Sequence, residues 1–238
     1  MESKNRIIVA ALIMGIGIAI AGLFISQTLI KARALERYVT VKGLSEREVM
    51  ADLAIWPVEI TIASNDLKQL EEDLLRQTGT IQGFLEDQGF SEEEITIGSP
   101  NIQDTRANLY GGNSSGSQYR YVAGRDITIR TSDIKKLHET LEQIPSLISK
   151  GIIMGSKNYW QQIEYLYTRL NDIKPAMIEE ATKNAREAAE KFARDSESKV
   201  GKIKSASQGL FSIENRDINT GHIKKVRVVN SVVFYLED

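Results

Sequence analysis

Residues 51–88 read ADLAIWPVEITIASNDLKQLEEDLLRQTGTIQGFLEDQ and join an extended segment directly to an amphipathic one. Residues Ala51 to Ala63 are rich in strand formers and predict a strand. Apolar residues then recur at spacings of three, four or seven, which predicts one face of a helix: Leu67, Leu70, Leu74, Ile81 and Leu85. Asn65 can cap this helix and Gly89 can end it. Because Pro57 has no N–H group, we expect an edge position or a bulge near it.

The same two patterns continue on both sides of this segment. Further strands are predicted over residues 38–43, 95–106, 118–130, 152–168, 202–216 and 223–236, and further helices over 132–144 and 172–199. This order predicts an α+β fold in which antiparallel sheets are covered by two long helices and one short helix. Residues 51–103 and 152–213 both run strand, helix, strand, which indicates a possible internal duplication.

The second long helix has an unusual apolar face, because most of its members are small. Its predicted core-facing residues are Met177, Ala181, Ala185, Ala188, Ala189 and Phe192. Pro175 falls in the first turns, where proline is tolerated. We therefore expect this helix to lie close to the sheet that it covers.

The N-terminus carries an apolar segment, residues 7–30, whose first 19 residues through Ile25 contain no polar side chain. About 20 apolar residues in a helix cross the hydrocarbon layer of a bilayer. We expect a membrane anchor at 1–30, a linker at 31–37 and one domain at 38–238. Basic residues flank the segment on both sides and do not settle its orientation; we expect the N-terminus inside and the bulk of the chain outside. In the alternative interpretation, a signal peptide is cleaved near Ala21.

Small residues within this segment repeat at four-residue spacing, at Ala11, Gly15 and Ala19. Such residues allow two membrane helices to approach closely, so self-association through the anchor is one interpretation. The other is that Gly and Ala are simply frequent in membrane helices.

The composition weakens several functional classes. The chain has 30 Lys and Arg against 32 Asp and Glu, so it lacks the basic excess of nucleic-acid-binding proteins. It has no cysteine, which excludes disulfides, thiol nucleophiles and thiolate metal sites. Of its two histidines, we expect His138 to be a half-buried packing residue and His222 to be exposed and alone in a turn. We predict no catalytic residue, no cofactor and no metal site.

Two features are candidate partner surfaces. A Gly/Ser-rich loop over residues 111–117 is expected at the tip of a hairpin, and no lysine or helix follows it as a phosphate loop would require. The predicted strand 152–168 carries Tyr159, Tyr165 and Tyr167 on one face and Trp160 on the other. These aromatic residues either cover a sheet or contact a small molecule or protein. A hydrolase using Glu59 and Glu164 as buried carboxylates is a third, costlier possibility.

An ordered series of motifs resembles the SIMPL-domain family. The series begins with VTVKGLSEREV over residues 39–49 and continues with Ala51, Ala54, Trp56 and Pro57. Later matches are Gly89-Phe90 before residues 94–97, and Tyr119-x-Tyr121-x-Ala123. The series ends with a helical pattern that leads into residues 200–203 and consists of Ala181, Ala185, Ala188, Phe192 and Ala193. The chain departs from the family where Trp56-Pro57 replaces Pro-Asp and where Gly79 and Gly83 stand in an alanine-poor first helix.

The resemblance implies a bacterial exported envelope protein. Members of the family include immunogenic proteins, proteins associated with tolerance of oxidative stress, and large homo-oligomers, and no catalytic residues are established for them. We therefore expect a non-enzymatic protein, anchored in the inner membrane through residues 7–30, that self-assembles in the periplasm or outside the cell and supports envelope integrity or tolerance of oxidative stress. The alternative is a binding or adaptor module for a small molecule or protein. No nucleic-acid partner is expected.

Overall fold

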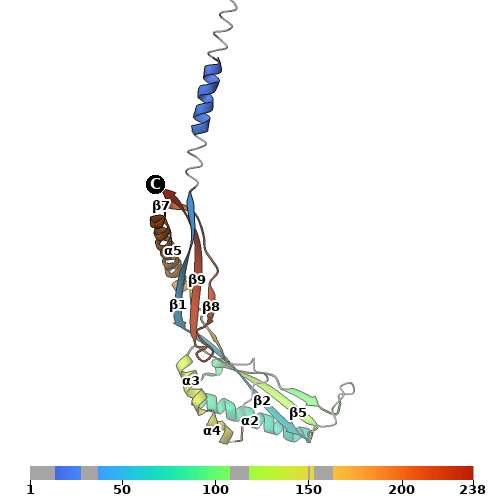
Figure 1. Cartoon of the computed structure of the whole chain (residues 1–238). Coiled ribbons are helices and arrows are strands. Elements are labelled where there is room, and N and C mark those ends of the chain that lie inside the picture. Colours follow the sequence, from blue (N-terminus) through green and yellow to red (C-terminus); the bar gives the residue numbers. More distant parts are fainter. Residues whose placement is uncertain (1–13, 28–36, 108–117, 150, 153–162, 238) are drawn as a thin grey trace, which may run out of the picture. The chain divides into compact units, whose positions relative to one another are not determined.

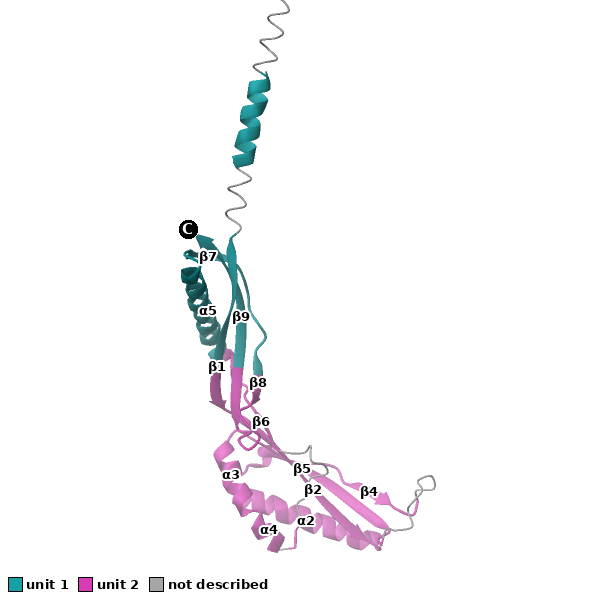
Figure 2. Cartoon of the chain, viewed as in Figure 1, with its two compact units in different colours: residues 1–46, 173–212, 227–238 teal, residues 47–172, 213–226 magenta. Residues whose placement is uncertain are grey.

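The α+β class is confirmed in a computed structural model that describes residues 14–27, 37–107, 118–149, 151–152 and 163–237. Strands and helices alternate along the chain, and the strands form two antiparallel sheets (Figure 1). The chain divides into two compact units (Figure 2). Unit 1 holds residues 1–46, 173–212 and 227–238, and unit 2 holds residues 47–172 and 213–226.

Unit 2 is built on a sheet of five strands. The strands are β2 (Leu53–Ser64), β3 (Ile95–Ile97), β4 (Asn101–Asp104), β5 (Tyr121–Thr131) and β6 (Glu164–Leu166). Their order is β3-β5-β2-β6, and β4 also pairs with β5. The long β2–β5 pair runs from Ala54 opposite Thr131 to Ser64 opposite Tyr121.

Pro57 lies opposite Thr128 in this pair, and the register passes it without a shift. The bulge that we considered is therefore absent from the β2–β5 pair. On the other side of β2, pairing with β6 ends at Ile55, before Pro57 is reached. A residue without an N–H group is tolerated there because no β6 partner needs that donor.

Helix α2 (Leu67–Asp87) confirms the helix predicted from the apolar spacing between Leu67 and Leu85. Its cap is Asp66 and not Asn65: Asp66 Oδ1 accepts hydrogen bonds from the backbone N–H groups of Lys68 at 2.8 Å and Gln69 at 3.1 Å. The chain leaves the helix through Gly89, whose φ of 86° favours glycine. The predicted stripe is buried except for Leu67, which is 48% exposed, and it also includes Thr78 and Phe84.

Two further helices of unit 2 are α3 (Ile134–Gln143), capped by Asp133, and α4 (Pro145–Ser149). A 3-10 turn, η1 (Glu92–Glu94), precedes β3. Apolar residues of the helices and of β2 and β5 form one core, whose most buried members include Ile60, Leu70, Ile81, Ile127 and Leu137. This burial is the main stabilising contribution to unit 2.

Unit 1 contains the second sheet, in the order β1-β9-β7 with β8 paired to β9. Its elements are β1 (Tyr38–Met50), α5 (Leu170–Asp195), β7 (Lys199–Ser207), β8 (Ser212–Asn215) and β9 (Ile223–Glu237); the unit boundaries fall inside β1, α5, β8 and β9. Helix α5 packs on β1 and β9 through Val41, Ala185, Ala189, Val232 and Phe234.

The small-residue face of α5 is confirmed over Met177, Ala181, Ala185 and Ala189. The prediction is wrong for Phe192, which is 61% exposed; the buried face continues through Ala193 instead. Small side chains allow close contact: the backbone of Ala181 lies directly against Gly43 of β1.

Several predicted strands are shorter than expected. The strand predicted over 152–168 is described only as β6, and residues 153–162 lie outside the described residues. The segment 95–106 contains two short strands, β3 and β4, and 202–216 contains the end of β7 and β8. The order strand, helix, strand does recur in the two segments compared above. However, β2 and β3 share one sheet, whereas β6 and β7 belong to different sheets.

At the N-terminus, residues 14–27 form a helix with exposed side chains. Ala11 lies outside the described residues, and Gly15 and Ala19 are exposed. Within the described part of the chain, no helix is long and apolar enough to cross a membrane.

Candidate functional site

The two histidines of the chain lie side by side, although the sequence predicted that His222 would be alone. His138 comes from α3, and His222 lies between β8 and β9. Their ring centroids are 4.7 Å apart, and the ring planes meet at 81°. Both side chains are half-buried, and both belong to unit 2.

Tyr165 of β6 completes this group, which we call the His–Tyr cluster (His138, Tyr165 and His222). A hydrogen bond of 2.9 Å joins His138 Nε2 to Tyr165 Oη. The Tyr165 ring centroid lies 5.8 Å from that of His138 and 6.0 Å from that of His222, both in edge-on geometry. Three elements distant in sequence therefore bring two imidazoles and one phenol together.

The protonation of the cluster is set by burial and by neighbouring charge. Burial raises the pKa of the Tyr165 phenol. Burial also lowers the pKa of His222, and the nearby His138 and Arg216 lower it further, while Asp217 opposes them. His222 therefore becomes a neutral imidazole at a lower pH than an ordinary histidine does.

Hydrogen bonds to the Asp217 carboxylate and between backbone groups hold the turn that carries His222. Asp217 Oδ1 accepts hydrogen bonds from the backbone N–H groups of Asn219 and Thr220, each at 2.9 Å. Asp217 Oδ2 accepts from the Thr220 hydroxyl and from Arg216 Nε. The His222 carbonyl accepts from the backbone N–H of Ala51 at 2.8 Å. These contacts hold His222 in place before any ligand arrives.

Tyr165 is positioned by pairing and by close packing. It lies opposite Ala54 in the β2–β6 pair. Its ring packs on Gly221, where an added Cβ atom would lie 3.3 Å from Tyr165 Cδ2. Glycine at this position therefore leaves room for the tyrosine ring beside the turn.

A buried lysine lies on β9, two residues after His222. Lys224 donates a hydrogen bond to Asn215 Oδ1 on β8. Burial lowers the pKa of the Lys224 ammonium group, and the charge of Glu164 opposes this shift. Arg216 and Asp217 thus act on His222 with opposite effects, and Glu164 acts on Lys224.

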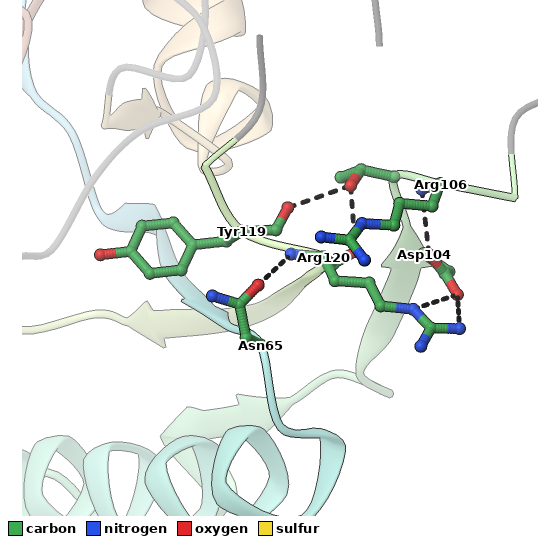
Figure 3. Close-up of polar contacts among 6 residues, drawn as sticks. Asn65, Asp104, Arg106, Tyr119 and Arg120 are labelled. Atoms are coloured by element: carbon green, nitrogen blue, oxygen red, sulfur yellow. Dashed lines mark hydrogen bonds and ion pairs between the residues drawn. The ribbon is translucent and has the colours of Figure 1, made fainter. Parts of the chain in front are cut away.

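A second set of polar contacts links the end of β4 to the residues just before β5 (Figure 3). Asp104 Oδ2 accepts hydrogen bonds from Arg120 Nε and Nη2, each at 3.1 Å. Asp104 Oδ1 accepts from the backbone N–H of Arg106 at 3.0 Å, and Asn65 Oδ1 accepts from the backbone N–H of Arg120 at 2.9 Å. The hydrogen bonds from Arg120 lower the pKa of Asp104. The Gly/Ser-rich residues 111–117 lie outside the described residues.

The other candidate residues are distributed differently from the predictions. Tyr159 and Trp160 lie outside the described residues, whereas Tyr165 and Tyr167 are half-buried. Glu59 is buried, at 7% exposure, but Glu164 is exposed, so the possibility of a hydrolase with both carboxylates buried does not hold for Glu164. In the described ranges, no group of three or more His, Asp or Glu side chains is arranged to hold a metal ion.

These features define a two-sheet α+β protein that carries the His–Tyr cluster in unit 2. The chain matches the SIMPL family, described as a protein of unknown function (DUF541), over residues 39–228, and it belongs to that family. The resemblance carried by the motifs is thereby confirmed. No curated protein matches this sequence.

Proposed function

We propose that this SIMPL protein is a non-enzymatic envelope protein, held in the bacterial inner membrane by residues 7–30, with residues 38–238 in the periplasm or outside the cell. The observation that carries the proposal is the apolar N-terminal segment. In its described part, residues 14–27, the large apolar side chains are exposed. The second half of the proposal, a role in self-assembly and in envelope integrity or tolerance of oxidative stress, is what the family resemblance implies.

The apolar side chains of residues 14–27 are not buried by the rest of the described chain. Ile18 and Phe24 are each 68% exposed, and Met14, Leu23 and Ile25 are similarly exposed. A contiguous apolar surface of this kind normally contacts lipid or another protein. The 14 helical residues 14–27 span about 21 Å, and the 19 apolar residues from Ile7 to Ile25 would span about 28 Å as a helix, close to the thickness of the hydrocarbon layer.

The absence of native cysteine permits a direct test of topology, because each introduced cysteine is the only thiol in the chain. Leu210, in unit 1, is 95% exposed, so Leu210→Cys reports on the domain. Ser3→Cys is the matched reporter for the other side of the membrane. In spheroplasts, an impermeant maleimide should label Leu210→Cys, and it should label Ser3→Cys only after the membrane is permeabilised. The reverse pattern would contradict the proposed orientation.

Retention of the anchor is tested by the mass of the mature protein. An uncleaved chain has the full mass of 26.6 kDa and stays in the membrane after an alkaline wash. A shorter chain that begins near residue 22 and is released by the wash would support the cleaved-signal alternative.

Self-assembly is tested by light scattering after size exclusion, on the full chain in detergent and on residues 38–238. A multimer of residues 38–238 that survives dilution would place assembly in the domain. Assembly of the full chain alone would place it in the anchor, where Ala11, Gly15 and Ala19 could bring two helices together. Monomers in both preparations would contradict self-assembly.

A binding or adaptor module is the second candidate, and the half-buried Tyr165 and Tyr167 favour it. The chain has two tryptophans, and Trp56 lies in the core of unit 2. Trp56→Phe therefore leaves Trp160 as a single fluorescent reporter near Tyr159. A partner on this surface should change the emission of Trp160; no change with envelope lipids, glycans or cell extract would count against this candidate.

A further inference from the structure

We propose that the His–Tyr cluster is a binding site for one divalent transition-metal ion, with Cu(II) bound most tightly. The donors would be one imidazole nitrogen each from His138 and His222 and the phenol oxygen of Tyr165. This site is separate from the proposed membrane anchor, and neither proposal depends on the other.

The distance between the two imidazole rings fits a shared ion. Metal–nitrogen bonds to histidine are about 2.0–2.1 Å long, so two imidazoles bound at roughly a right angle would have ring centroids about 4.5–5 Å apart. The observed distance is 4.7 Å. The rings therefore already have the separation that two ligands of one ion need.

The position of the phenol oxygen agrees with the same arrangement. Two donor atoms, each about 2.1 Å from one ion and at a right angle to one another, lie about 3 Å apart. His138 Nε2 and Tyr165 Oη are 2.9 Å apart. Without an ion, a hydrogen bond joins these two atoms, and the tautomer of His138 decides which of them donates. With an ion, Nε2 carries no proton, the phenol proton leaves to solvent, and both atoms bind the metal.

The chemistry of the donors selects the class of metal. Imidazole suits copper, zinc and nickel, and among divalent ions Cu(II) generally binds nitrogen and oxygen donors most tightly. A half-buried site admits an ion from solvent, and the turn contacts of Asp217 and the β2–β6 pairing fix the ligands in advance. The two charged side chains that act on His222, Arg216 and Asp217, are of opposite sign.

The test uses the full chain in detergent, produced without a histidine tag, so that His138 and His222 are its only imidazoles. Calorimetric titration with Cu(II) should give one saturable site, and electron paramagnetic resonance should show nitrogen couplings. His138→Gln and His222→Gln should each weaken binding about 10- to 100-fold or more. Tyr165→Phe should remove the visible phenolate-to-copper absorption, whereas the control Tyr38→Phe, at an exposed position of β1, should bind copper like the original chain.

A measurement on the unaltered chain protects the test against variants that fail to fold. One equivalent of Zn(II), which is diamagnetic, should shift the imidazole NMR signals of both histidines together. A chain that shows no saturable site, or zinc shifts confined to one ring, would overturn the proposal. Equal copper affinity in folded His138→Gln and the original chain would also overturn it and would leave only a packed aromatic cluster.

Discussion

Gly43 of β1 and Ala181 of α5 touch through their backbones: a Cβ atom added to Gly43 would lie 1.8 Å from the Ala181 carbonyl oxygen. Such a distance is far inside van der Waals contact, and neither partner is a flexible side chain. Residue 43 therefore has to be glycine for α5 to lie on the sheet as it does. Ser45 adds to this contact, because its hydroxyl donates to Glu180 Oε2 at 3.0 Å.

Gly43→Ala should destabilise the protein by about 3 kcal/mol or more, because overpacking that cannot be relieved by a side-chain rotation moves the helix. Urea unfolding followed by circular dichroism measures the change. Gly79→Ala is the matched control: Gly79 lies in α2 with nothing within 4 Å of an added Cβ atom, so alanine should stabilise by about 0.5–1 kcal/mol. Equal effects of the two substitutions would contradict the close β1–α5 contact.

Asp66→Ala should lower the free energy of unfolding by about 1 kcal/mol, because it removes the cap from the first N–H groups of α2. Asp66→Asn keeps a side-chain oxygen and should retain most of the stability. Urea midpoints of the two variants decide the matter. If Asp66→Ala unfolds at the same midpoint as Asp66→Asn, the capping role is wrong.

The Asp217 carboxyl should titrate at low pH, because hydrogen bonds from Thr220 and Arg216 lower its pKa to about 2. The folded state thus binds a proton less readily than the unfolded state. The contribution of Asp217 to stability is therefore present above its usual pKa near 4 and is lost as the pH falls through about 2. Carboxyl carbon NMR measures this pKa. Thr220→Val should raise it, and an unchanged value would show that the hydroxyl has no such role.

Phe192→Ser should change stability by no more than about 0.5 kcal/mol, because the side chain is on the exposed face of α5. Ala189→Leu, three residues earlier on the buried face, should cost about 1–3 kcal/mol by overpacking. Thermal unfolding of both variants tests the assignment of the two faces. A larger loss for Phe192→Ser than for Ala189→Leu would reverse it.

Local sequence patterns predicted helices and strands well where the spacing of apolar residues alone distinguishes a helix from a strand. Helix α2 was predictable because its apolar residues recur at helical spacing and a glycine follows. The choice of Asp66 over Asn65 was not, because both residue types can cap and only the loop contact of Asn65 with Arg120 separates them. Phe192 was assigned to the core from its hydrophobicity, although the angular position of Ala193 is the one that faces the sheet.

The His–Tyr cluster could not be predicted from spacing, for a physical reason. No single helix or strand contains two of its members, so no periodic pattern brings them together. Their proximity depends on the β2–β6 pairing and on the hydrogen bond between Ala51 and His222, which joins segments from opposite ends of the domain. The sequence contains only two histidines, and two histidines far apart in a chain do not by themselves indicate a shared site.

Unit 2 is built from two separate stretches of the chain, residues 47–172 and 213–226. One part of this unit is therefore synthesised later than the rest. The stretch that carries His222 is made after all of α5 and β7. Unit 2 can therefore acquire this second stretch only when α5 and β7 have already been synthesised. Until then Ala51 lacks the His222 carbonyl as its hydrogen-bond acceptor, and the contacts of His138 and Tyr165 with His222 cannot form.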